Sequence, residues 1–130
     1  MSIPLNTLVV VADGSGAKLF RNTSTSGAIS LRNEGTLAPQ DLSDDGPSGS
    51  RPEEQTRRQT DEATFAKQLA KKLYLMHHNG EFETMVLIAD PQTLGQMRDA
   101  MHKSVAMAIV RSLNKDLKNH SIDEIAEALG

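Results

Sequence analysis

Acidic, hydroxyl and glycine residues gather in the stretch Asp13-Gly14-Ser15-Gly16, a composition compatible with phosphate or metal chemistry. A glycine-rich loop binds phosphate when its backbone N–H groups point at the ligand and a helix follows the loop. Here Leu19 occupies the position where a dinucleotide-binding loop needs a small residue, and a strand-like pattern follows. We therefore interpret the stretch as a tight hairpin turn whose glycines supply positive φ angles.

The same stretch, continued by Ala17 and Lys18, also resembles the first phosphate loop of actin-like ATPases. Those enzymes hold their nucleotide between two related domains. A chain of 130 residues has the length of one ordinary domain, and a second such loop does not occur in it. The hairpin is therefore the favoured interpretation.

Asp13 and Asp90 form a second candidate group, because each directly follows a short apolar run. Two carboxylates at the ends of neighbouring strands are suited to Mg²⁺ and would support a metal-dependent nuclease. Local roles compete with this hypothesis, since Asp before Gly suits a turn and Asp before Pro91 suits a helix N-cap. A third acid is not evident on the helix that would carry it. We expect no metal or cofactor and keep these two residues as the catalytic candidates.

Basic residues form a third group, which contains Arg51, Arg57, Arg58, Lys67 and Lys71. Such a group is able to contact the phosphates of a nucleic acid. Acidic residues between positions 53 and 62 are interleaved with it, so a solvated charged surface is the alternative interpretation.

The first half of the chain predicts three antiparallel strands and one long loop. Apolar or alternating patterns mark strands over residues 7–12, 17–22 and 28–37. Residues 38–58 are rich in Pro, Gly, Ser and charged residues, so they predict a long polar loop.

The second half predicts helices and strands in alternation. A capping pattern at Thr56 and an apolar stripe predict a helix that ends near His78, with Gly80 as its left-handed cap. Residues 85–89 predict a buried strand, and Asp90 begins the next helix. Residues 104–113 are ambiguous, and we expect them to form the last strand. Ser121 opens a short final helix.

These elements give the order β-β-β-α-β-α-β-α and an α/β fold. Three antiparallel strands followed by α/β crossovers indicate a mixed sheet with helices packed on it, as in the ribonuclease H-like fold. We expect one domain over residues 1–130 with the loop at about 38–58.

Composition and net charge limit the cellular compartment and the partners that we expect. Cysteine is absent and the N-terminus lacks a signal-peptide pattern, so we expect a cytoplasmic protein without membrane insertion. The formal net charge of -3 gives no overall attraction to nucleic acid. Oligomeric state and protein partners are not predicted by the sequence.

Four segments resemble the bacterial host attachment protein family, described as proteins required for attachment to host cells. They are residues 10–20 (VVADGSGAKLF), 65–73 (FAKQLAKKL), 80–98 (GEFETMVLIADPQTLGQMR) and 114–117 (NKDL). The resemblance implies a small cytoplasmic, non-enzymatic protein that acts indirectly in attachment.

That family is in turn similar to the middle domain of archaeal and eukaryotic peptide release factors, which carries a catalytic Gly-Gly-Gln loop. In this chain Gly46, Gly49 and Gln55 are scattered within the corresponding loop. The resemblance therefore gives no support for peptidyl-tRNA hydrolysis. It implies, as an alternative function, a translation-related factor that associates with the ribosome or with RNA.

Overall fold

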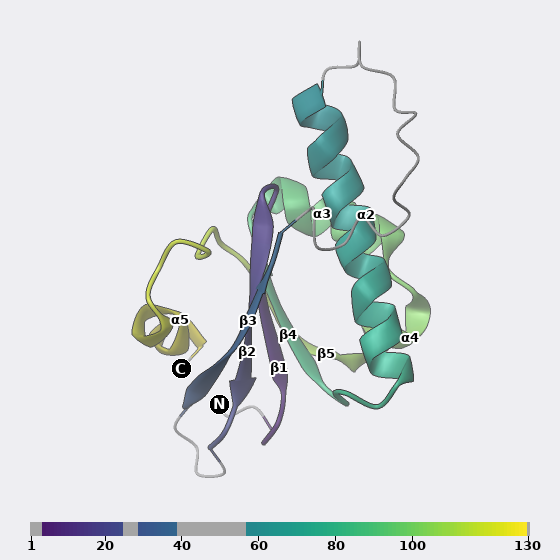
Figure 1. The fold of residues 1–130 in the computed structure, drawn as a ribbon. Coiled ribbons are helices and arrows are strands. Elements are labelled where there is room, and N and C mark those ends of the chain that lie inside the picture. Colours follow the sequence, from purple (N-terminus) through teal and green to yellow (C-terminus); the bar gives the residue numbers. More distant parts are fainter. Residues whose placement is uncertain (1–3, 25–28, 39–56, 130) are drawn as a thin grey trace.

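The computed structural model describes residues 4–24, 29–38 and 57–129, with residues 57–64 described as helical backbone (Figure 1). In chain order the elements are β1 (Leu8–Asp13), β2 (Gly16–Asn22), β3 (Leu31–Leu37), α2 (Arg57–His78), β4 (Met85–Ala89), α3 (Pro91–Ala100), α4 (Lys103–Ala108), β5 (Ile109–Asn114) and α5 (Ile122–Leu129).

The strands form one mixed sheet in the order β3-β2-β1-β4-β5. The first three strands form the antiparallel pairs β1–β2 and β2–β3. On the other side of β1, β4 pairs with it in parallel, and β5 pairs in parallel with β4. This arrangement confirms the predicted α/β class and is consistent with a ribonuclease H-like or release-factor middle-domain fold.

The two central strands, β1 and β4, are apolar on both faces. Val10 and Leu87 pack into the cluster that contains the buried side of α2, whereas Val9 and Val86 pack with Ile125 of α5. Figure 1 shows α2, α3 and α4 on one side of the sheet and α5 on the other. Burial on both faces explains why these strands are continuous apolar runs.

Local capping residues set several helix boundaries as the sequence predicts. Asp90 caps α3, because its Oδ2 accepts a hydrogen bond from the Thr93 N–H at 3.2 Å. Ser121 and Glu124 form a reciprocal capping box at α5, with distances of 3.1 and 3.0 Å. Gly80, just after α2, has φ of +76°. Thr56, the predicted cap of α2, lies outside the described residues.

Residues 104–113 do not form one strand, which corrects the prediction. Lys103–Ala108 is helical (α4), and β5 begins only at Ile109. His102 caps this helix, because its ring Nδ1 accepts a hydrogen bond from the Ser104 N–H at 3.0 Å. Histidine is not a favoured N-cap residue, so the sequence carries little signal for this helix. Between β4 and β5, where all residues are described, the chain therefore contains one more helix than predicted.

The β1–β2 connection is the predicted tight turn, but it does not use positive φ angles. Asp13 pairs with Gly16, and among the described glycines only Gly35 and Gly80 have positive φ. The turn is closed instead by the Asp13 side chain, whose Oδ1 accepts from the Ser15 N–H at 2.7 Å. Gly16 allows close approach, since a Cβ there would lie 3.1 Å from the backbone oxygen of Leu37.

Most of the predicted polar loop, residues 39–56, lies outside the described residues. Its predicted last residues, Arg57 and Arg58, belong to α2. In the part of the chain that the structure describes, every helix is too short or too polar to cross a membrane.

Replacing Gly16 and Gly95 by alanine should change stability in opposite directions. Gly16→Ala would push a Cβ against the Leu37 carbonyl of β3, and we expect the free energy of unfolding to fall by roughly 1–2 kcal/mol. Gly95→Ala places its Cβ in open space within α3 and should raise this free energy by about 0.5–1 kcal/mol. Urea denaturation followed by circular dichroism measures both. A Gly16→Ala protein as stable as the parent would contradict the close-approach argument.

Candidate functional site

The tip of the β1–β2 hairpin contacts the segment between β5 and α5. Lys118 Nζ donates to Ser15 Oγ at 2.8 Å and lies 3.4 Å from Asp13 Oδ1. Ser15 Oγ in turn donates to the same Asp13 oxygen at 2.7 Å. The three side chains therefore form one polar cluster that joins residues more than a hundred positions apart.

The environment of Asp13 favours its charged form. Partial burial alone would raise the pKa of this carboxyl, but the Ser15 side-chain and backbone hydrogen bonds and the charge of Lys118 outweigh it. The pKa of Asp13 is consequently held below its ordinary value of 3.8. Asp13 is therefore ionised at neutral pH.

Asp13 and Asp90 lie close together, as expected for residues at the ends of neighbouring parallel strands. Both line one shallow pocket of about 290 Å³, together with Asp116, which the sequence interpretation did not single out. Asp90 Oδ2 caps α3, and its buried Oδ1 has no hydrogen-bond partner among the described residues. The sequence thus correctly placed two acids at one edge of the sheet.

The contacts of these acids match the local roles better than a metal site. Lys118 supplies positive charge beside Asp13, and Asp90 is engaged by the start of α3. Within the described residues, no group of three or more His, Cys, Asp or Glu side chains is placed to hold a metal ion. The nuclease hypothesis therefore stays a prediction from sequence.

The outward side of α2 is a lysine face, formed by Lys67, Lys71 and Lys72. All three side chains are exposed, and none forms an ion pair with another residue that the structure describes. The opposite side of the helix, including Phe65 and Leu69, is fully buried. Packing of this apolar side fixes the direction in which the lysines point.

The predicted arginine contacts are only partly located. Arg57 and Arg58 lie in the first turn of α2, where the backbone is described. Arg51 lies outside the described residues. The structure brings Lys67 and Lys71 together on one helix face, one turn apart.

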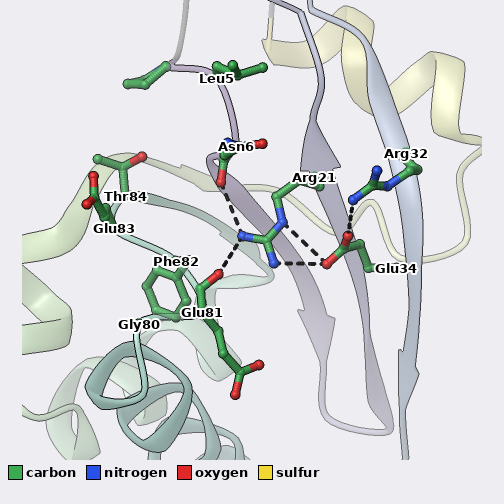
Figure 2. Close-up of a pocket in the computed structure, with 11 residues that line it drawn as sticks. Leu5, Asn6, Arg21, Arg32, Glu34, Gly80, Glu81, Phe82, Glu83 and Thr84 are labelled. Carbon is green, nitrogen blue, oxygen red and sulfur yellow. Dashed lines mark hydrogen bonds and ion pairs between the residues drawn. The ribbon is translucent and has the colours of Figure 1, made fainter.

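A second pocket, which we call the Arg21 pocket, lies at the opposite edge of the sheet (Figure 2). It has a volume of about 510 Å³ and is lined by residues 4–6, by side chains of β2 and β3, and by residues 80–84. Arg21 Nη1 donates to the backbone oxygens of Asn6 and Glu81 at 3.2 and 3.0 Å. One guanidinium therefore connects three segments of the chain.

Glu34 accepts from two arginines in this pocket. Its Oε1 lies 2.9 Å from Arg21 Nη2, and its Oε2 lies 2.7 Å from Arg32 Nη2. The Arg32 hydrogen bond, followed by the Arg21 hydrogen bond and charge, outweighs partial burial and holds the pKa of Glu34 below its ordinary value of 4.5. Sequence reasoning missed this group, because nothing local links position 21 to positions 6 and 81.

Asp13→Asn should lower stability at neutral pH and remove part of its pH dependence. Because the folded-state pKa is depressed, the stabilisation is present above the ordinary pKa of 3.8 and is lost as the pH falls through the folded-state pKa. At pH 7 we expect a loss of up to about 1 kcal/mol in the free energy of unfolding, because the cluster is partly solvated. The difference from the parent should shrink as the pH falls below the unfolded pKa and through the lower folded-state pKa.

Lys118→Met provides the matched control for this prediction. It should cost a similar amount at neutral pH, and the double variant Asp13→Asn, Lys118→Met should lose less than the sum of the two. Urea titrations at several pH values measure these terms. Strict additivity would show that the two side chains are not coupled.

Comparison with known proteins gives the family. No curated protein matches this sequence. The family model described as bacterial archaeo-eukaryotic release factor family 12 matches residues 6–129, which is nearly the whole chain. This confirms the release-factor part of the sequence resemblance, whereas the host-attachment name is not confirmed. The chain therefore belongs to bacterial archaeo-eukaryotic release factor family 12.

Proposed function

We propose that the protein is a translation-related factor that associates with the ribosome or with RNA through the lysine face of α2. The family membership supports a role in translation. The lysine face supplies the charge that such an association needs, and it is the observation on which the proposal rests.

Positive charge is concentrated on this helix against an acidic background. The chain as a whole has 14 Lys and Arg residues against 17 Asp and Glu residues. Residues 65–78 contain Lys67, Lys71 and Lys72 but no acidic residue. Because these lysines lack ion-pair partners among the described residues, their charge remains available for an external anion.

The geometry of the face suits a nucleic-acid backbone. Lys67 and Lys71 are separated by four residues of helix, which corresponds to a rise of about 6 Å. Lysine ammonium groups act as point charges and contact phosphates without reading bases. We therefore expect binding that depends strongly on salt and weakly on RNA sequence.

The proposal extends to the arginines that precede the lysine face. Arg57 and Arg58 lie on the same helix, and Arg51 lies shortly before it in the sequence. These three residues would lengthen the basic strip toward the N-terminus of α2. Their contribution is part of the proposal and is tested together with it.

The proposed role is binding rather than peptide release. The Gly-Gly-Gln tripeptide on which release depends is not contiguous here, because Gly46, Gly49 and Gln55 are separated in sequence. We therefore propose a non-enzymatic factor that contacts the ribosome without hydrolysing peptidyl-tRNA.

Sedimentation with ribosomes from the same lysate tests the proposal. The parent protein should co-sediment at low salt and be released at high salt. Lys67→Gln, Lys71→Gln should weaken binding and reduce the slope of log affinity against log salt by about 2, because two phosphate contacts are lost. Replacing Arg51, Arg57 and Arg58 by alanine in addition should reduce this salt slope further.

The control replaces two exposed lysines that lie elsewhere. Lys103→Gln, Lys115→Gln removes the same charge from the start of α4 and the segment after β5. This variant should bind as the parent does. Equal losses of ribosome binding in both variants would show that net charge, and not the lysine face, determines binding. Failure of the parent protein to sediment with ribosomes at low salt would refute the proposal.

A further inference from the structure

The Arg21 pocket has the size and the fixed donors of a binding site that the proposed function does not use. Its volume of about 510 Å³ lies within the range typical of small-molecule sites. It lies at the edge of the sheet where residues 4–6 meet residues 80–84, and its donors do not belong to the lysine face.

Arg21 is held rigidly inside this pocket. Its side chain is only 13% exposed, and its Nε and Nη groups make four hydrogen bonds, to Glu34 and to the Asn6 and Glu81 backbone oxygens. A guanidinium fixed in this way presents its remaining N–H in a constant direction. Preorganisation of this kind lowers the entropic cost of binding a ligand.

Arg32 has hydrogen-bond donors without a partner among the described residues. It lies directly opposite Arg21 on the neighbouring strand, and its side chain is 64% exposed. Of its five N–H groups, only one at Nη2 has a partner among the described residues, namely Glu34. Two like charges placed opposite each other on antiparallel strands repel, and one carboxylate balances only one of them. The trio of Arg21, Arg32 and Glu34 therefore keeps an excess of one positive charge.

Two glutamates of the pocket limit the kind of anion that this excess positive charge attracts. Glu81 gives its backbone oxygen to Arg21 but points its carboxylate away from the guanidinium, and Glu83 lies beside Thr84 (Figure 2). Both glutamates are exposed at this pocket. They would repel a long polyanion such as RNA more strongly than a small molecule with one anionic group.

We propose that the Arg21 pocket binds a small molecule through an anionic group, a phosphate or a carboxylate. Arg32 contacts this group with its unused donors, and Arg21 adds its remaining Nη2 hydrogen. Glu34 acts as the internal competitor, because it occupies the same two guanidinium groups when the ligand is absent. Planar forks of this kind match the oxygens of both anions.

Titration with inorganic phosphate, followed by NMR of the arginine Nε–H signals, tests the proposal. Ionic strength is kept constant with sodium chloride, and a parallel titration uses acetate. The Arg32 signal should shift saturably, with a dissociation constant on the order of millimolar. The signal of Arg98, which bonds to Ser112 at another part of the sheet, should not follow it.

Two substitutions separate ligand binding from general charge effects. Arg32→Gln should weaken phosphate binding about tenfold, and Arg32→Lys should weaken it less. Glu34→Gln should strengthen binding by about tenfold, because it removes the competing charge while Arg21 keeps its two backbone partners. The variant Lys67→Gln, Lys71→Gln should bind phosphate as the parent does. Dispersed amide spectra establish that each variant is folded.

The outcomes distinguish the two sources of the anion. Tighter saturation by phosphate than by acetate assigns the pocket to a phosphate-bearing ligand, and the reverse order assigns it to a carboxylate. Linear, non-saturating shifts for both anions would overturn the proposal. An unchanged or weaker affinity in folded Glu34→Gln would overturn it too, since the excess positive charge would then play no part.

Discussion

The parallel pairing of β1 with β4 is the constraint on which the rest of the structure depends. Their register, with Val10 opposite Leu87, aligns two strands whose apolar side chains are completely buried on both faces of the sheet. A strand of this kind is stable only when both faces are covered. The long helix α2 with α3 and α4 supplies one cover, and α5 supplies the other.

This pairing also decides what lies at the two edges of the sheet. The carboxyl ends of β1 and β4 meet, so the hairpin residue Asp13 and the helix cap Asp90 share one pocket. At the other edge, the segments that lead into these strands meet beside β2, where Arg21 bonds to backbone oxygens of both. Polar residues thus lie at both ends of the two apolar central strands, and at one end Arg21 supplies hydrogen bonds to backbone oxygens.

The two polar groups differ in how strongly the fold depends on them. The Asp13–Lys118 pair is partly solvated, and such pairs contribute little to stability. Arg21 is more buried, and its removal would leave the Asn6 and Glu81 backbone oxygens without their donor. Both residues are exposed, so water is able to replace this donor, and the cost of removing Arg21 is mainly the loss of the connection between segments. Arg21 therefore connects more segments than the Asp13–Lys118 pair does, whereas Arg32 carries the more accessible charge.

The parts of the fold that follow from local patterns were predictable. The buried runs of β1 and β4, the cap at Asp90 and the capping box at Ser121 depend on neighbouring residues, and the structure confirms them. The helix α4 was not predicted, because its N-cap is a histidine ring and because the β-branched residue Val105 is more typical of a strand. The hairpin was predicted, but the reason given was wrong, since a side-chain hydrogen bond replaces the positive φ of glycine.

The two candidate sites also differ in whether local sequence patterns predict them. Lys67 and Lys71 belong to one helical stripe, so their common exposed face follows from the periodicity of α2. The Arg21 pocket combines residues from four segments, and only the sheet register places Arg32 opposite Arg21. The helix α2 connects the two regions, because it carries the lysines outward and is followed by Gly80, which lines the pocket. A ligand held in the pocket would therefore lie against the turn that follows the helix with the lysine face.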